Sequence, residues 1–151
     1  MTITTHEKTL EQIKKFFDKN NWEPLPFQIE SWEAFLNGEN GIIQVPTGCG
    51  KTYAALMGPL SKLKDCRKKS GLNILLITPL KALSRDLKNA INSAAKYFDE
   101  EITVGIRNGD TSPYQKKKQI LNPPNILITT PESLSLLLSK YFINKKIKSL
   151  E

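Results

Sequence analysis

Apolar side chains follow two different spacings along this chain of 151 residues. In the first part they recur every three or four residues, which is the spacing of one face of an amphipathic helix. This spacing is found at Leu10, Ile13, Phe16 and Phe17, and again at Ile29, Trp32 and Leu36. It predicts one helix over residues 6–19. A second helix is predicted to begin at about Pro26, where proline is tolerated in the first turn, and to end at Gly38.

From residue 41 the pattern changes to short, nearly continuous apolar runs, each followed by a turn and a helical segment. The runs predict strands over residues 41–45, 73–78, 102–107 and 125–130. The helices are predicted from Lys51, near residues 80–97, near residues 112–121, and from Pro131 to about Tyr141. Apolar strands that alternate with helices indicate a mainly parallel sheet with helices on both faces. The predicted fold class is therefore α/β in three layers, with a helical region over residues 1–38 and an α/β core over residues 39–151 of one domain.

One residue conflicts with the helix that is predicted from Lys51. Pro59 lies inside this helix, where a proline removes a backbone hydrogen bond and its ring crowds the preceding turn. We therefore expect the helix to bend or to end early near Gly58 and Pro59.

The composition excludes several classes of protein. No run approaches the roughly 20 consecutive apolar residues of a membrane span, and the N-terminus lacks an apolar secretory signal, so we expect a cytoplasmic protein with no membrane partner. Cys49 and Cys66 are too far apart for a Cys-x-x-Cys pair, and with a single histidine they cannot complete a zinc site. We interpret them as reduced thiols. The net charge of +7 favours polyanions, but we interpret most of the lysine clusters (residues 62–69, 116–118 and 145–148) as solvated helix faces.

The strongest chemical signal is the segment Val45-Pro46-Thr47-Gly48-Cys49-Gly50-Lys51-Thr52, between a predicted strand and a predicted helix. This context is typical of a phosphate-binding loop, because glycines let successive N–H groups point into one concavity and the helix N-terminus favours an anion. Lys51 would supply charge to the β- and γ-phosphates, and the Thr52 hydroxyl would ligate Mg²⁺. Val45 occupies the first glycine position of the strict motif, and Cys49 fills a variable position. A chance turn before a helix is the alternative, which the flanking strand and helix disfavour.

Five segments, in their order along the chain, resemble superfamily-two DExH helicases. Within that superfamily they are most similar to the large helicase-related group, especially the ligase-associated DEXH-box DNA helicases of bacteria. The segments are Pro26–Gln28, Val45–Thr52, Thr78–Leu83, Arg107–Thr111 and Asn122–Leu134. The resemblance extends over nearly everything from Trp22 to Leu137 and implies a RecA-like fold with ATP and Mg²⁺ as cofactors.

The resemblance implies an ATP site. It assigns nucleotide binding to Pro46, Thr47, Gly48, Cys49, Gly50, Lys51 and Thr52, with Lys51 and Thr52 also catalytic and Thr52 as the Mg²⁺ ligand. Gln28 corresponds to the Q-motif glutamine, whose amide can read the adenine edge as both donor and acceptor. From the residue alone, Gln28 would be a surface glutamine on an amphipathic helix. Phe17 and Trp22 are candidates for stacking on the adenine, although core packing is the interpretation that we favour for both.

The resemblance also implies that loops after the strands hold the sugar-phosphate backbone of one nucleic-acid strand, without reading its sequence. The matching residues are Pro79, Leu80, Lys81, Arg107, Gly109, Asp110, Thr111, Thr130, Pro131 and Glu132. These segments follow predicted strands, at the carboxyl edge where α/β sheets bind ligands. Without the resemblance, Thr130–Glu132 would be only a helix N-cap with an acidic first turn. Single-stranded DNA is the expected ligand, with RNA as the alternative.

The family continues after a further strand with an Asp-Glu-x-His segment, which this sequence does not contain. We therefore interpret the chain as the N-terminal part of a first motor lobe, with the sheet incomplete at its C-terminal end. Because the positioned metal and water are needed for phosphoryl transfer, we expect nucleotide binding with little hydrolysis. In a longer protein the partners would be a second motor lobe and C-terminal domains. The resemblance leaves association with a DNA ligase or nuclease open.

The predicted function is that of an ATP-dependent DNA helicase or translocase. A 3′-to-5′ direction and a role in DNA repair are implied by the resemblance alone. The alternative is a nucleotide-responsive nucleic-acid-binding module that does not hydrolyse ATP. A P-loop kinase acting on a small molecule is disfavoured, since it has no use for the segments around Lys81, Asp110 and Thr130.

Overall fold

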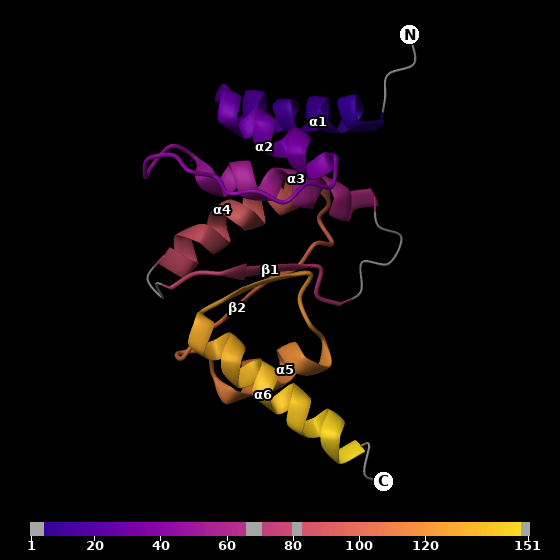
Figure 1. The fold of residues 1–151 in the computed structure, drawn as a ribbon, viewed down its shortest axis with the longest axis vertical. Coiled ribbons are helices and arrows are strands. Elements are labelled where there is room, and N and C mark those ends of the chain that lie inside the picture. Colours follow the sequence, from indigo (N-terminus) through magenta and orange to yellow (C-terminus); the bar gives the residue numbers. More distant parts are fainter. Residues whose placement is uncertain (1–4, 66–70, 80–82, 149–151) are drawn as a thin grey trace. The chain divides into compact units, whose positions relative to one another are not determined.

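A computed structural model describes residues 5–65, 71–79 and 83–148 (Figure 1). Helices and strands alternate in its second half as the apolar runs predict. In chain order the elements are α1 (Thr5–Lys19), α2 (Pro26–Leu36), α3 (Lys51–Asp65), β1 (Ile74–Ile77), α4 (Leu83–Phe98), β2 (Val104–Arg107), α5 (Pro113–Leu121), β3 (Ile126–Thr129) and α6 (Pro131–Lys148). The predicted start of α4 near residue 80 lies outside the described residues, and α6 is longer than the helix predicted to end near Tyr141. Among the described helices, none has the length and apolar character needed to cross a membrane.

The chain divides into two compact units. A helical unit contains Met1–Lys69 and Ser93–Glu101, and a sheet unit contains Ser70–Asn92 and Ile102–Glu151. Helix α4 contributes its first part to the sheet unit and its last part to the helical unit.

Aromatic side chains form the core of the helical unit. Phe16 and Phe17 of α1 are buried, and the ring of Phe17 lies 5.2 Å from that of Trp32, which is fully buried in α2. The indole Nε1 of Trp32 donates to the backbone oxygen of Tyr53 in α3 at 3.0 Å, so the polar end of the buried indole is satisfied. Trp22 stays 44% exposed with its ring 5.2 Å from that of Tyr53. The preferred interpretation of Phe17 as a core residue is consistent with its burial.

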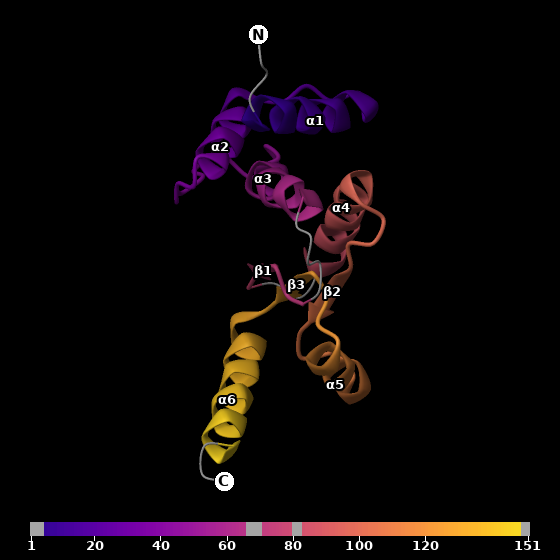
Figure 2. The same ribbon diagram turned by 90° about the vertical axis from the view of Figure 1, so that its right-hand side faces the viewer.

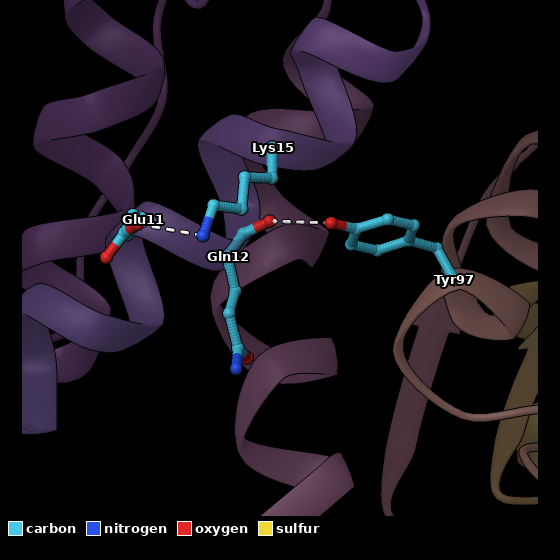
Figure 3. Close-up of polar contacts among 4 residues, drawn as sticks. All are labelled: Glu11, Gln12, Lys15 and Tyr97. Carbon is cyan, nitrogen blue, oxygen red and sulfur yellow. Dashed lines mark hydrogen bonds and ion pairs between the residues drawn. The ribbon is translucent and has the colours of Figure 1, made fainter.

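The end of α4 contacts α1 within the same unit (Figure 3). The hydroxyl of Tyr97 donates to the backbone oxygen of Gln12 at 3.4 Å. Next to it, Glu11 and Lys15 form an ion pair of 2.8 Å one helical turn apart. Both partners are more than half exposed, so the pair contributes little to stability.

Helix α3 continues through Pro59 to Asp65, so the expected early end near Gly58 is wrong. The packing around this turn explains the continuation. Gly58 has no Cβ and lies against Phe35 of α2, which allows the two helices to approach closely. In the same turn, the hydroxyl of Ser61 donates to the Gly58 oxygen at 2.6 Å. The alternative expectation, a bend at Pro59, stays a prediction.

The strand predicted over residues 41–45 does not form, and this segment has no regular secondary structure. Ile42 is 94% exposed despite its apolar side chain. A strand exists only when its backbone N–H and C=O groups have a partner strand. The described part of the helical unit contains only helices and loops, so residues 41–45 have no such partner there.

The sheet unit is built on three parallel strands in the order β1-β3-β2. The central strand β3 is buried at all four positions, as expected for a strand covered on both faces. The edge strand β1 alternates half-buried and exposed residues. Helices α5 and α6 lie on the same side of this sheet (Figure 2). The prediction of a mainly parallel α/β arrangement is confirmed.

Polar side chains also join the strands. The carboxamide oxygen of buried Asn125 accepts from the backbone N–H and the hydroxyl of Thr103, both at 2.9 Å. At the other end of the strands, the hydroxyl of Thr129 donates to the backbone oxygen of Arg107 at 2.8 Å. These bonds support the register of β2 on β3, in which Arg107 stands level with Thr129, and Ile77 of β1 stands level with the same threonine.

Candidate functional site

The glycine-rich loop lies directly before α3 in the helical unit. Gly48 and Gly50 have φ angles of +85° and +79°, which glycine adopts at low cost and other residues rarely do. Residues 46–48 are exposed, and Lys51 is the first residue of α3. The loop therefore presents its backbone to solvent at a helix N-terminus, where an anion is favoured.

The Lys51 ammonium bonds within the loop. Its Nζ donates to the backbone oxygen of Val45 at 2.8 Å, and Lys51 is only half-buried. An ammonium group can exchange a neutral carbonyl for a phosphate oxygen, because the phosphate carries a negative charge that attracts the ammonium. A Cβ at Gly48 would meet no atom within 4 Å, so there is open space beside the loop. The residues present thus fit a polyphosphate.

Gln28 is 3% exposed, and its carboxamide joins the start of α2 to the loop. Its Oε1 accepts from the backbone N–H of Leu25 at 2.9 Å, and its Nε2 donates to the backbone oxygen of Gly50 at 3.1 Å. The Gly50 oxygen also accepts the first α3 bond from the N–H of Ala54 at 3.2 Å. Gln28 is therefore in contact with the loop. Both ends of its amide hold backbone groups, and an adenine edge would take the place of one of them.

Thr52 follows Lys51 in the first turn of α3 and is half-buried. A Mg²⁺ ion at this place would be held by the Thr52 hydroxyl and by nucleotide oxygens. Among the described residues, no group of three or more His, Cys, Asp or Glu side chains could hold a metal ion. Cys49 is a free thiol within the loop, and Cys66 lies outside the described residues.

Three predicted nucleic-acid segments converge in the sheet unit. Because the strands are parallel and Ile77, Arg107 and Thr129 stand level, the residues that follow them leave the sheet at one edge. Pro79, Gly109, Asp110, Pro131 and Glu132 are exposed there. Leu80 and Lys81, which were predicted to contact the same strand, lie outside the described residues.

Arg107 occupies an interior position, unlike the other cations of this region. It is 5% exposed, and its Nη1 donates to the backbone oxygen of Lys116 in α5 at 3.0 Å. Burial lowers the pKa of its guanidinium from the ordinary value. Arg107 therefore attaches α5 to the end of β2.

The loop after β2 is held by its own side chains. The Oδ1 of Asn108 accepts from the Asp110 N–H at 3.0 Å, and the Thr111 hydroxyl accepts from the Asn108 N–H at 3.0 Å. Thr111 is 9% exposed, so its hydroxyl supports the loop, while Gly109 and Asp110 are exposed residues. Asn108, to which the sequence assigned no role, is thus the residue that shapes this turn.

Thr130 stands at the start of α6 and is 3% exposed. Its hydroxyl accepts from the Ser133 N–H at 3.4 Å, which is the N-cap geometry expected from the sequence without the resemblance. Glu132 adds a negative charge in the first turn of the helix.

A cavity of about 1110 Å³ lies beside β2, between the first part of α4 and α5, and was not predicted from the sequence pattern. Residues that contribute to it include Lys88, Tyr114, Lys118 and Gln119. Lys118 belongs to a lysine cluster that we interpreted as a solvated helix face. The spacing of four residues between Tyr114 and Lys118, which places both on one face of a helix, is the sequence signal that could have indicated a site here.

Known proteins share this sequence and fold. The family model for DEAD/DEAH box helicases matches residues 25–151. The Lhr helicase/probable uracil glycosylase of Mycolicibacterium smegmatis is 39% identical over 128 residues, which cover 77% of this chain and 8% of that protein. The ATP-dependent helicase Lhr-Core of Sulfolobus acidocaldarius is 35% identical over 150 residues, which cover 93% of this chain and 17% of that protein.

A solved structure, Mycobacterium smegmatis helicase Lhr bound to ssDNA and AMP-PNP, matches with a TM-score of 0.75 and 36% identity, over 90% of this chain and 18% of that one. The chain thus spans less than a fifth of the length of these relatives. The similarities confirm the RecA-like α/β fold and the resemblance to helicases of the large helicase-related (Lhr) group. With the family model matched over most of its length, the chain belongs to the DEAD/DEAH box helicase family.

Proposed function

We propose that this chain is the ATP-binding part of an ATP-dependent DNA helicase or translocase. The observation that carries the proposal is the position of Lys51. It begins α3 directly after two glycines of positive φ, in a chain that belongs to a helicase family. Hydrolysis of the bond between the β- and γ-phosphates of ATP would supply free energy to the longer protein. The residues of the chain bind and orient the nucleotide: loop N–H groups and Lys51 at the phosphates, the Thr52 hydroxyl at Mg²⁺, and Gln28 beside the loop.

The proposal includes a path for single-stranded DNA over the sheet unit. The exposed residues Gly109 and Asp110 and the start of α6 at Thr130–Glu132 leave the sheet at one edge, together with Pro79. Such groups can hold phosphates of one strand without reading its bases. The solved relative bound to ssDNA and AMP-PNP supports both ligands. The 3′-to-5′ direction, a role in DNA repair and partners such as a second motor lobe are part of this proposal for the longer protein.

Nucleotide binding tests the proposal, since this sequence lacks an Asp-Glu-x-His segment and little turnover is expected. A fluorescent ATP analogue would be titrated into the chain and into Lys51→Ala with Mg²⁺ present. We expect roughly ten- to hundredfold weaker binding by the variant, because a charged hydrogen bond is worth about 1.5–3 kcal/mol. Removing Mg²⁺ should weaken binding by the unaltered chain and affect Thr52→Ala less.

Lys64→Ala is the matched control, since Lys64 is an exposed lysine at the other end of α3. It removes the same charge from the same helix and should bind the nucleotide as the unaltered chain does. Equal affinity of Lys51→Ala and Lys64→Ala would overturn the proposed nucleotide site.

A further inference from the structure

All residues that line the cavity beside β2 belong to the sheet unit. Its floor is the outer edge of β2, at Val104, Gly105 and Ile106. Its rim includes Asn108 and Asp110–Ser112, from the loop Asn108–Ser112 that we propose as a contact for single-stranded DNA. A volume of about 1110 Å³ is sufficient for a ligand of nucleotide size.

The floor of the cavity is not open to a further strand. β2 is an edge of the described sheet, and an edge strand ordinarily offers its free N–H and C=O groups to another chain. Here the Ile106 oxygen accepts from Gln119 Nε2 at 2.9 Å and from the Thr111 hydroxyl at 3.4 Å. The middle of the edge is therefore already bonded to side chains, which disfavours an extended peptide as the occupant.

Gln119 lines the cavity and fixes its floor. The Nε2 of Gln119 donates to the Ile106 oxygen, and this bond sets the orientation of the amide, because exchanging Oε1 and Nε2 would bring two acceptors together. The Oε1 of the same amide is buried and has no hydrogen-bond partner among the described residues, so it is closed to a ligand in the cavity. Gln119 therefore shapes the cavity by holding the edge of β2.

The rest of the lining favours a nucleotide. Lys88 and Lys118 bring two positive charges to the cavity against the single negative charge of Asp110, and Tyr114 presents an aromatic ring that is 76% exposed. Asn89 and Gln115 add amides that can donate and accept. The base of a nucleotide offers a face for stacking and polar edge groups, and its phosphate matches the lysines.

We propose that this cavity holds one nucleotide of the single-stranded nucleic acid that contacts the Asn108–Ser112 loop. Tyr114 stacks on the base, and Lys118 neutralises a phosphate. The inference rests on the proposed function and adds a base-holding site to a path that otherwise touches only the backbone.

The test measures binding of a short fluorescein-labelled single-stranded oligodeoxynucleotide by anisotropy, at several salt concentrations. Lys118→Ala should lower the slope of log K against log salt by about 0.7, the value for one phosphate contact on a single strand. Lys117→Ala is the matched control: it lies next in the same helix, is exposed and does not line the cavity. It should leave the slope nearly unchanged. Equal slopes for the two variants would overturn the phosphate contact.

A second comparison isolates the base. Tyr114→Ala should bind the oligonucleotide about fivefold or more weakly, the effect of losing one stacked base, yet bind an abasic strand of equal length as the unaltered chain does. A loss of the same size on both strands would overturn the stacking role. The same titration with an RNA strand of equal sequence shows whether the chain prefers deoxyribose or ribose.

The outcome for the unaltered chain separates the two proposals. If it binds no single-stranded nucleic acid, the proposed function fails together with the cavity. If it binds and the Lys118 and Tyr114 variants behave like Lys117→Ala, only the cavity inference falls. A photo-cross-link from 5-iodouracil to Tyr114, located by mass spectrometry, would support the inference independently of affinity.

Discussion

Gly48 and Gly50 have nearly the same backbone conformation and different surroundings. Both have φ near +80°, so any side chain at either position would add strain of about 1–2 kcal/mol. A Cβ at Gly48 would enter open space, whereas a Cβ at Gly50 would come within 2.6 Å of the Gln28 Nε2. The second glycine is thus required by its neighbour as well as by its φ.

The residue-scale prediction is that Gly50→Ala destabilises the chain more than Gly48→Ala. The new methyl group must displace the end of the Gln28 side chain and break its bond to the Gly50 oxygen, which adds about 1–3 kcal/mol. Urea unfolding measures the difference. In a Gln28→Ala background the two glycine substitutions should cost the same. An unchanged difference in that background would show that Gln28 is not the cause.

The structural role of a residue can be predicted from its sequence context in some cases and not in others. Lys51 and Thr52 are predictable because a motif of fixed spacing determines their place at the start of a helix. Arg107 is not, since nothing in the sequence distinguishes a guanidinium that contacts a ligand from one that holds the Lys116 carbonyl. Gln119 is also hidden, because its partner Ile106 lies thirteen residues away on another element.

At the scale of elements, the close approach of α2 and α3 depends on Gly58. Alanine in a helix interior is ordinarily more stable than glycine by about 0.5–1 kcal/mol. A Cβ at Gly58, however, would lie 2.8 Å from Cδ1 and 3.3 Å from Cβ of Phe35. The ring of Phe35 also has the Lys62 ammonium 5.0 Å from its centroid, so its displacement would disturb a second contact.

We therefore predict that Gly58→Ala lowers the free energy of unfolding, by roughly 1–3 kcal/mol for an overpacked contact, against the ordinary preference of helices. Thermal or urea unfolding gives the sign directly. With Phe35→Ala the Cδ1 and Cγ atoms that cause the clash are removed, and alanine at position 58 should then be neutral or stabilising. A stabilising Gly58→Ala in the otherwise unaltered chain would contradict this account of the packing.

The elements also mark the limit of local prediction. Spacing alone locates α1, α2 and the three strands to within a few residues, because each has a continuous apolar pattern. Residues 41–45 have an equally apolar pattern and form no strand. Pairing is not a local property, and the described helical unit offers no partner. Pro59 is the converse case, where helix α3 continues through a local helix breaker at a turn packed against α2.

At the scale of the whole molecule, the sheet has an apolar edge. β1 pairs only with β3 among the described residues, and its Leu75 and Ile77 are 40% and 52% exposed. An exposed apolar edge strand can pair with another chain, and a charge on such a strand prevents this. The general layout of strands and helices was predictable from the sequence, but which strand stands at an edge follows from the order β1-β3-β2.

We predict that the chain self-associates through β1 as its concentration rises. The apparent mass from static light scattering should increase with concentration, and Ile77→Lys should suppress the increase without unfolding the chain. Ile120→Lys is the control, because Ile120 is similarly exposed, at 54%, but lies on α5. It adds the same charge away from any strand edge and should leave the association in place. Equal suppression by both variants would mean that net charge, rather than the edge of β1, governs association. A constant monomer mass for the unaltered chain would refute the prediction outright.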